Sequence, residues 1–433
     1  MTLSYTEYQE IAANIRPNGQ AFIDGKFCDA ADGQKFDTTN PATGQVLASV
    51  AHCKAVDVDR AVIAARRVFN AGTWSRAEPE ARKEVLLKVA TLVRKHTHEL
   101  AVLESLDTGK TINDCMDEIG GEVVNFFQWY AELADKSFGK IAPTGLSALA
   151  LIVKEPAGVA GAVLPWNFPL VMAAWKIAPS LSVGCSAIIK PAEQTPLSTI
   201  RLAELMQEAG VPDGVINIIP GYGETAGQAI GMHNDIDTVS FTGSSEVGRM
   251  FMRYSGDSNL KGVGLEMGGK SPFIVLEDAL LDDELIEHAA MSAFWNGGQN
   301  CSANMRQLIA TPLVDEFTGL ILERVKAFKL GDPLDPATDI GSMITKDHKE
   351  MVMSYIQSGV DEGANMLTGG ESDIPGYFIK PTVFENITPE MKISREEIFG
   401  PVLGIMPVKN AEEALRIASN TDYGLHATVF TQN

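Results

Sequence analysis

A cysteine on backbone suited to chemistry ends the run FWNGGQNC at residues 294–301. A segment with helical spacing, residues 281–295, stops at the pair Gly297-Gly298 just before Cys301. Because glycine adopts positive φ at no steric cost, the pair permits a tight turn and close approach of other groups. Such a turn would hold the thiol in one direction, as a nucleophile requires. The alternative is a buried cysteine without a chemical role, which is the common fate of an isolated cysteine.

Two further residues could complete a reaction at this thiol. Glu266 directly follows an apolar run, and a carboxylate that reaches the thiol through water can serve as a base. Asn167 lies between Trp166 and Phe168 in the run PWNFP, and its amide N–H could donate to a developing oxyanion, an interaction that stabilises the transition state. Each also has a plain explanation, since Glu266 could be a surface carboxylate and Asn167 a turn-forming residue.

Short apolar runs alternate with helical patterns and predict a parallel sheet flanked by helices. Gly109 and Lys110 follow the second expected helix as stop signals. The expected helices are residues 56–69, 82–106, 198–209, 246–254, 317–328 and 346–362, and the expected strands are residues 187–189, 215–219, 238–241, 263–265, 273–276 and 402–406.

The stretch 157–175 carries no charge and is long enough to span a bilayer. Pro165, Asn167 and Pro169 interrupt it, and a lipid-exposed helix could not satisfy the backbone groups that prolines free. We therefore expect a buried strand, a turn and a buried helix here.

Polar clusters follow four of the expected strands, at residues 190–193, 221–227, 242–244 and 266–269. Ligands of an open parallel sheet bind at the carboxyl ends of its strands, so the clusters predict a binding edge. Gly243 and Ser244 open a helix, where amide groups and a hydroxyl would face an anion at the positive end of the helix dipole. Gly223 would admit an adenine ring.

Lys190 and Glu193 stand three residues apart after a strand and could bind the hydroxyls of a ribose. A carboxylate there would repel a 2′-phosphate, which favours NAD over NADP as the cofactor. Neither the glycine pattern of the usual dinucleotide fold nor a P-loop occurs at these positions.

Composition limits the class of protein. A chain of 433 residues, 45% of them hydrophobic, can form two or three domains. Its net charge of -21 argues against nucleic acid or an anionic membrane as a partner. The five cysteines are odd in number and form no C-x-x-C pair, which predicts reduced thiols in a cytoplasmic protein and neither disulfides nor a metal site. The first residues do not form a signal peptide.

Seven motifs, in order along the chain, resemble those of the NAD(P)-dependent aldehyde dehydrogenase superfamily. The similarity extends from about Ala21 to the end of the chain. The motifs are NPATG at 40–44, PWNFP at 165–169, KPAE at 190–193, FTGS at 241–244, LEMGGK at 265–270, GQNC at 298–301 and EEIFGP at 396–401.

The resemblance implies catalytic roles for four residues. Cys301 would be the nucleophile, Glu266 the general base, and Asn167 with the Cys301 backbone N–H the oxyanion hole, with Lys176 in a supporting role. A thiohemiacetal on Cys301 would pass a hydride to NAD, and water activated by Glu266 would hydrolyse the thioester to the acid.

The resemblance also implies a cofactor site and a substrate tunnel. Lys190 and Glu193 would hold the adenosine ribose, Ser244 the pyrophosphate, and Glu397 the nicotinamide ribose with Phe399 beside it. The remaining expected cofactor residues are Trp166, Gly223, Gly243 and Val247. The tunnel would be lined by Phe168, Met172, Trp175, Asn300 and Ser302.

The implied fold is α/β, with a Rossmann-like parallel-sheet cofactor domain, a second α/β catalytic domain and a small β oligomerisation extension. Residues 1–140 and 159–268 would form the cofactor domain, 141–158 the β arm, and 269–433 the catalytic domain. Family members usually continue for several tens of residues beyond Asn433, with a loop lining the aldehyde entrance and a terminal strand that pairs across subunits. With that strand we expect a homodimer or homotetramer.

The substrate class implied by the overall resemblance is an aldehyde of the aminoaldehyde type, such as γ-glutamyl-γ-aminobutyraldehyde, with betaine aldehyde close to it. Two alternatives remain open at this stage. One is a catalytically weak NAD-binding homologue, and the other is a CoA-acylating semialdehyde dehydrogenase, although Glu266 favours water over CoA as the acceptor.

Overall fold

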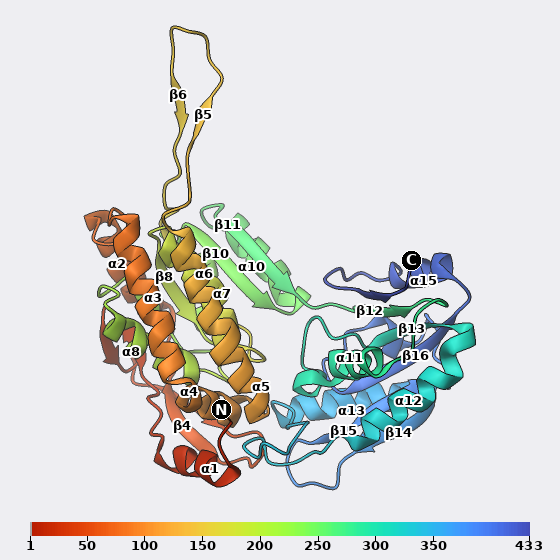
Figure 1. Cartoon of the computed structure of the whole chain (residues 1–433). Helices are drawn as coiled ribbons and strands as arrows, with labels where there is room; N and C mark the ends of the chain where they lie inside the picture. The colour runs from red at the N-terminus through yellow and green to blue at the C-terminus, as the bar shows by residue number, and fades with distance from the viewer. Residues whose placement is uncertain (1) are drawn as a thin grey trace.

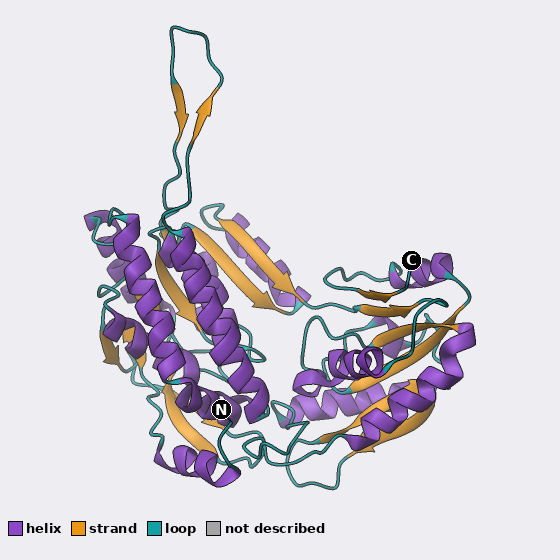
Figure 2. Ribbon diagram, in the orientation of Figure 1, coloured by secondary structure: helices purple, strands orange, loops and turns teal. Residues whose placement is uncertain are grey.

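Two α/β domains lie side by side, and a thin hairpin projects from one of them (Figure 1). The computed structural model describes residues 2–433. The first domain contains a seven-stranded sheet in the order β11-β10-β7-β8-β9-β1-β2, and the second a six-stranded sheet in the order β14-β15-β16-β13-β12-β17. Figure 2 shows helices covering both sheets. The chain passes from the first sheet to the second between Met267 and Pro272.

The first sheet is parallel except at one edge, where β1 and β2 are antiparallel. Every residue of its central strands β7 and β8 is buried, as expected for strands covered on both faces. Its strands are β1 (Ala21–Ile23), β2 (Lys26–Cys28), β7 (Val159–Val163), β8 (Ser186–Lys190), β9 (Ile216–Ile218), β10 (Thr238–Gly243) and β11 (Gly262–Met267).

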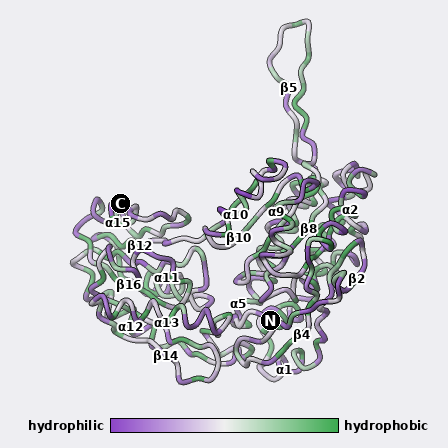
Figure 3. Tube along the Cα trace, turned by 180° about the vertical axis from the view of Figure 1, so that it is seen from behind, coloured by the Kyte–Doolittle hydropathy of each residue, from purple (hydrophilic) through white to green (hydrophobic). Residues whose placement is uncertain are grey.

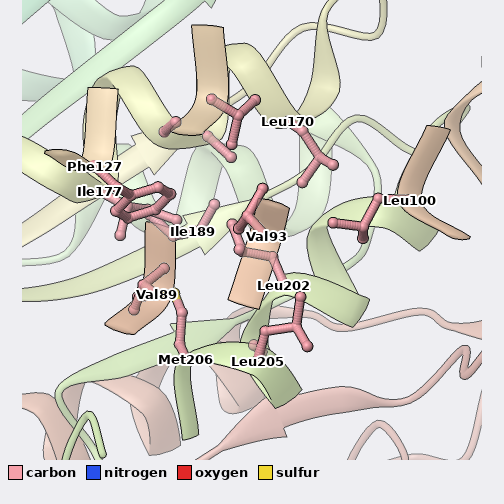
Figure 4. Packing of buried hydrophobic residues seen from close by; sticks show 14 of the residues in the cluster. Val89, Val93, Leu100, Phe127, Leu170, Ile177, Ile189, Leu202, Leu205 and Met206 are labelled. Atoms are coloured by element: carbon pink, nitrogen blue, oxygen red, sulfur yellow. The ribbon is translucent and has the colours of Figure 1, made fainter. Parts of the chain in front are cut away.

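Successive residues of β8 point to opposite faces and enter two separate hydrophobic clusters. Ile189 packs with helices α3, α4, α6, α7 and α8 (Figure 4), whereas Ile188 packs with α2 and α10. The helices of this domain are α1 (Tyr5–Asn14), α2 (Ala55–Ala71), α3 (Pro79–Lys95), α4 (Thr97–Thr108), α5 (Ile112–Asp117), α6 (Val124–Leu133), α7 (Pro169–Ser182), α8 (Leu197–Ala209), α9 (Gln228–Met232) and α10 (Ser245–Gly256), with π-helical turns at η1 (Glu118–Val123) and η2 (Gly223–Gly227).

The second sheet is parallel except for its edge strand β14. Hydrophobic clusters under α11 and α12 and under α13 and α15 cover its two faces. Its elements are β12 (Pro272–Val275), α11 (Asp283–Phe294), η3 (Trp295–Gly298), β13 (Arg306–Ala310), η4 (Thr311–Leu313), α12 (Val314–Ala327), α13 (Lys346–Asp361), β14 (Asn365–Glu371), β15 (Ile379–Glu385), α14 (Lys392–Arg395), β16 (Val402–Val408), α15 (Ala411–Ala418) and β17 (Thr428–Phe430).

The projecting hairpin consists of β5 (Lys140–Ala142) and β6 (Ala150–Ile152), which pair only with each other. It carries apolar side chains that are largely exposed, and green segments along it in Figure 3 mark them. A second separate ribbon, β3 (Lys35–Thr39) with β4 (Val46–Ala51), lies in the first domain.

With one exception, the helices and strands expected from the sequence are present, with ends shifted by a few residues. The uncharged stretch 157–175 forms β7, a turn and the start of α7, and no helix among residues 2–433 is long and apolar enough to cross a membrane. The prediction of one helix over 82–106 is wrong, because the helix ends at His96 and a new one, α4, begins directly after it. The Thr97 hydroxyl donates to the carbonyls of Val93 and Arg94 and so replaces the helical bonds that are lost.

Candidate active site

The turn before Cys301 has three successive residues in the left-handed region. Asn296, Gly297 and Gly298 have φ values of 52°, 60° and 70°. Asn296 Nδ2 donates to the carbonyl of Gln299 over 3.2 Å, and Gln299 Nε2 donates back to the carbonyl of Asn296 over 3.1 Å. The prediction that the glycine pair permits a tight turn is confirmed, and an asparagine, which tolerates this region better than most residues, extends it.

Asn167 brings the first domain to this turn. It follows β7 and precedes α7, and its Nδ2 donates to the carbonyl of Gln299 over 3.0 Å in buried surroundings. In return Asn296 Nδ2 donates to the carbonyl of Asn167 over 3.3 Å. The structure therefore places the Asn167 amide beside the backbone that leads into Cys301.

Glu266 and Lys176 lie on neighbouring elements of the first domain. Glu266 is on β11 and is paired in register with Thr242 on β10. Lys176 projects from α7 and its Nζ donates to the hydroxyls of Thr242 over 2.7 Å and Ser240 over 3.1 Å. The two hydroxyls therefore hold the ammonium against the strand next to the one that carries Glu266.

The ionisable groups of the site influence one another. Burial raises the pKa of the Cys301 thiol to about 11, and the carboxylates of Glu266 and Glu397 act in the same direction. Burial also raises the pKa of Glu266, against the opposing charge of Lys176. Burial lowers the pKa of Lys176 to about 8, against the opposing charge of Glu266. With its pKa raised in this way, Cys301 is a thiol at neutral pH.

Glu397 contacts the glycine loop that connects the two sheets. Its Oε1 accepts a hydrogen bond from the Gly269 amide over 3.1 Å. A Cβ at Gly268 would lie 1.9 Å from Glu397 Oε2, and a Cβ at Gly269 would lie 2.7 Å from the carbonyl oxygen of Cys301. The two glycines thus allow Glu397 and the Cys301 backbone to approach the same loop.

Phe399 and Trp166 form an aromatic pair near this loop. Their ring centroids lie 5.3 Å apart at an interplanar angle of 84°, and His348 packs against both rings. His348 also bonds the Phe399 carbonyl through Nε2 over 2.7 Å. Phe399 itself has a φ of 56°, which is unusual for a side chain of this size and is held by these contacts.

The residues expected to bind adenosine form a separate group at the ends of β8, β9 and β10. Lys190 is buried, and its Nζ donates to Glu193 Oε2 over 3.0 Å and to the carbonyl of Pro191 over 2.9 Å. Gly223 has no atom within 4 Å of the position that a Cβ would take. No hydrogen bond described for residues 2–433 joins this group to the Cys301 turn.

The helix α10 begins where Gly243 ends β10. Ser244 is its N-cap, and the Ser244 hydroxyl accepts from the Val247 amide over 3.3 Å. The amides of the first turn point out of this end of the helix, which is an arrangement suited to an anion.

The expected tunnel residues are only partly together. Phe168 is buried, with its ring centroid 5.1 Å from that of Trp295. Met172 is also buried, whereas Trp175 is 42% exposed and packs on Phe126.

On the other side of the nucleophile, Asn300 Oδ1 accepts from the amide of Ser302 over 3.2 Å and from its hydroxyl over 3.1 Å. The Cys301 Sγ lies 3.8 Å from the same oxygen. Asn300 and Ser302 therefore form one hydrogen-bonded unit around the thiol.

Sequence reasoning gave no role to several buried residues near the site. Gln299 occurs in the GQNC motif, yet only the structure shows that its carbonyl binds Asn167. Lys110 was interpreted as a stop signal, but its side chain is fully buried and its Nζ lies 4.0 Å from the centroid of the Phe168 ring. Lys270 is buried without a hydrogen-bond partner among the described residues, and burial lowers its pKa to about 7. In the sequence, Lys270 is a charged residue inside the LEMGGK motif and Lys110 directly follows the helix stop at Gly109, and these positions were the only signals that could have indicated a role.

The described residues contain no group of three or more His, Cys, Asp or Glu side chains that could hold a metal ion.

Comparison with known proteins identifies the family. The sequence model of the aldehyde dehydrogenase family matches residues 27–433, and the chain belongs to this family. The aminoacetaldehyde dehydrogenase of Pseudomonas aeruginosa is 45% identical over 429 residues, which cover 99% of this chain and 86% of that protein.

Solved structures agree with the fold. The chain matches the γ-glutamyl-γ-aminobutyraldehyde dehydrogenase of Burkholderia cenocepacia J2315 with a TM-score of 0.97 and 43% identity, covering 100% of this chain and 87% of that one. It matches a mutant of the P. syringae indole-3-acetaldehyde dehydrogenase AldA, in complex with NAD+ and IAA, with a TM-score of 0.98 and 42% identity, covering 100% and 88%. The family and fold predicted from the sequence are confirmed, while the domain boundaries and the roles of individual site residues stay predictions.

The backbone of the cysteine turn can be tested at Gly298. A Cβ there would lie 2.4 Å from the Gly400 carbonyl oxygen at a φ of 70°. We expect Gly298→Ala to lower the free energy of unfolding by about 1–3 kcal/mol, which is the usual cost of backbone strain at one residue. Because the turn would shift, the rate of aldehyde oxidation should fall by more than about tenfold. Denaturant unfolding and initial rates measure these two effects.

The matched control is Gly319→Ala in α12, where no atom lies within 4 Å of the added Cβ. It should leave the activity unchanged, and the free energy of unfolding should stay the same or rise slightly. A Gly298→Ala protein with the stability and activity of the parent would contradict the account of the turn.

The thiol pKa predicts the pH dependence of alkylation. Because the raised pKa keeps Cys301 protonated, its alkylation by iodoacetamide should accelerate about tenfold per pH unit and level off only near pH 11. Glu266→Gln removes a negative charge that raises this pKa, so alkylation at pH 8 should become several-fold faster. Mass spectrometry of the Cys301 peptide measures the rate separately from that of the partly exposed Cys28. Slower alkylation in Glu266→Gln would be incompatible with the proposed charge effect.

Proposed function

We propose that this aldehyde dehydrogenase oxidises aminoaldehydes with NAD through a thioester on Cys301. The observation that carries the proposal is the contact of Asn167 Nδ2 with the Gln299 carbonyl, two residues before Cys301, because it sets an amide donor beside the nucleophile. The names of relatives that are 43–45% identical support the substrate class, since they act on aminoacetaldehyde and γ-glutamyl-γ-aminobutyraldehyde.

The reaction starts when the Cys301 thiol releases its proton to solvent water and its sulfur forms a bond with the carbonyl carbon of the aldehyde. The carbonyl oxygen gains the electron pair and becomes an oxyanion. One Asn167 amide hydrogen is used by the Gln299 carbonyl, which leaves the second hydrogen, with the Cys301 backbone N–H, to donate to that oxygen. Oxidised NAD, when bound, supplies a positive charge and accepts the hydride, and a thioester on Cys301 remains.

Glu266 then acts on water. Burial raises the pKa of Glu266, which makes its carboxylate a stronger base near neutral pH. The carboxylate takes a proton from water, the hydroxide oxygen attacks the thioester carbon, and the carbon–sulfur bond breaks. The carboxylic acid leaves and the sulfur of Cys301 regains a proton. The nearby ammonium of Lys176 offsets part of the negative charge of Glu266.

The residues present fit NAD. The helix end at Ser244 suits the pyrophosphate, and the Lys190–Glu193 pair offers an ammonium and a carboxylate for ribose hydroxyls. The open space at Gly223 leaves room for the adenine. Glu397, fixed by the Gly269 amide, offers a carboxylate to the second ribose, beside Phe399 and Trp166. The remaining members of this set, Gly243 and Val247, form the start of α10.

The substrate would pass Phe168, Met172 and Trp175 and meet Cys301 between Asn300 and Ser302. A chain with a net charge of -21 attracts a cationic aldehyde such as aminoacetaldehyde. The exposed face of Trp175 suits the ammonium of such a substrate, because a cation is attracted to an indole ring.

The assembly is proposed to be a homodimer or homotetramer in the cytoplasm. Hairpin residues such as Phe138, Ile141 and Leu149 are 75%, 72% and 72% exposed, which is costly for apolar side chains unless another subunit covers them. Free cysteines at all five positions suit a reducing compartment.

Two substitutions test the catalytic roles. Cys301→Ala should abolish NADH formation from any aldehyde. Glu266→Gln should slow thioester hydrolysis about a hundredfold, and slow the first NADH burst much less, as expected for loss of a general base. Rapid-quench and stopped-flow traces separate the two steps.

Glu277→Gln, which changes an exposed carboxylate after β12, is the control and should leave both steps unchanged. Turnover that persists in Cys301→Ala would refute the assignment. A thioester product that forms only with CoA would instead favour an acylating enzyme.

Cofactor preference is tested at Glu193. Glu193→Gln removes the charge that would repel a 2′-phosphate, so the ratio of kcat/KM for NAD to that for NADP should fall about tenfold, an order of magnitude corresponding to about 1.4 kcal/mol. Glu208→Gln on the exposed side of α8 should leave the ratio unchanged. If Glu193→Gln also leaves it unchanged, this carboxylate does not contact the adenosine ribose.

A further inference from the structure

We propose that Lys110, in the α4–α5 loop, is a positioning residue for the Asn167 amide. The inference rests on the proposed function, because it assigns Lys110 to the step in which Asn167 stabilises the oxyanion. Lys110 acts through Phe168, the neighbour of Asn167, and does not touch the substrate.

The Lys110 ammonium contacts Phe168 from inside the first domain. Lys110 is 1% exposed, and its Nζ lies 2.5 Å from Glu118 Oε2 and 4.0 Å from the centroid of the Phe168 ring. Burial acts to lower the pKa of Lys110, but the charged and polar groups around it, Glu118 foremost, together raise the pKa above its usual value. A desolvated cation over an aromatic ring is a strong, directional contact.

Glu104 of α4 fixes the residues that follow Phe168. Its Oε2 accepts from the amide of Leu170, in the first turn of α7, over 3.2 Å and from the Ser198 hydroxyl over 2.9 Å. This carboxylate, completely buried, satisfies an amide that the helix itself cannot. Two buried side chains therefore hold the segment from Asn167 to Leu170. Lys110 contacts the ring of Phe168, and Glu104 accepts from the amide of Leu170.

The same loop also reaches the cysteine turn of the second domain. The Gly109 carbonyl accepts from the Ser342 amide over 3.1 Å, and the Ser342 carbonyl accepts from Gln299 Nε2 over 3.3 Å. Gln299 in turn accepts Asn167 Nδ2 at its carbonyl. Residues 109–110 are thus linked to both partners of the Asn167–Gln299 hydrogen bond.

Stability alone does not explain a lysine here. A buried ion pair contributes little compared with well-packed apolar side chains of similar volume. A leucine or methionine could fill the space, but it would not hold the Phe168 ring in one orientation. The position and charge of Lys110 are therefore assigned to the geometry of the catalytic segment.

A double-mutant cycle between Lys110→Met and Asn167→Ala tests this coupling. With Asn167 present, Lys110→Met should lower the single-turnover rate of NADH formation by about tenfold to a hundredfold, part of the effect of losing an oxyanion donor. With Asn167→Ala, the same change should alter the rate less than twofold, because the donor is already gone. Lys110→Arg should restore most of the rate, and NAD affinity should change less than twofold.

The matched control is Lys261→Met, which removes another buried ammonium, bound to the Gly231 carbonyl. Lys261 lies just before the start of β11, whereas Glu266 lies near the other end of that strand. Its rate should remain within twofold of the parent. If Lys110→Met does not fold, the pair Lys110→Met/Glu118→Gln removes the unpaired carboxylate and is used in the same cycle.

Hydrogen exchange gives a readout that does not require turnover. The amides of Phe168 and of residues 170–172 should exchange at least tenfold faster in Lys110→Met and at the parental rate in Lys261→Met. Equal rate losses in the two Asn167 backgrounds, or unchanged exchange at these amides, would overturn the proposal. A parent protein that forms no NADH from any aldehyde would overturn the proposed function, while the exchange result would still decide whether Lys110 holds the segment.

Discussion

One hydrogen bond between the two domains organises the site. The turn after β7 supplies the Asn167 side chain, and the turn after α11 supplies the Gln299 carbonyl that accepts it. The bond forms because three residues with left-handed backbone direct the Gln299 carbonyl toward the first domain. The proposed placement of nucleophile, oxyanion donor and cofactor depends on these two turns meeting, since each sheet alone carries only part of the set.

The charges around Cys301 oppose its own ionisation. Burial and two carboxylates raise the thiol pKa, so at neutral pH the site holds a thiol and not a reactive thiolate. The carboxylate of Glu266, which contributes to the raised thiol pKa, is also the group proposed to activate water later in the cycle. Lys176 supplies an opposing positive charge at Glu266.

Local patterns in the sequence were sufficient for the sheet and for the candidate residues. Runs such as 187–189 are apolar at every position and predicted buried strands, and the polar clusters after them lie at the edge where we propose that the cofactor binds. The glycine pair before Cys301 predicted its turn. What could not be predicted depends on contacts between distant residues. Asn167 and Gln299 lie 132 positions apart, and the burial of Lys110 beneath Phe168 follows from packing that no short window contains. The end of α3 at His96 also could not be predicted, because the helical spacing of apolar residues continues from α3 into α4.

The most direct test of the account is the mass of the Cys301 peptide after Glu266→Gln is mixed with an aminoaldehyde and NAD and quenched in acid. The account predicts an added acyl group on Cys301, heavier than the thiol by the mass of the aldehyde less two hydrogens, in close to stoichiometric amount with NADH. NADH formed without any acyl group on Cys301, or an acyl group on another residue, would contradict it.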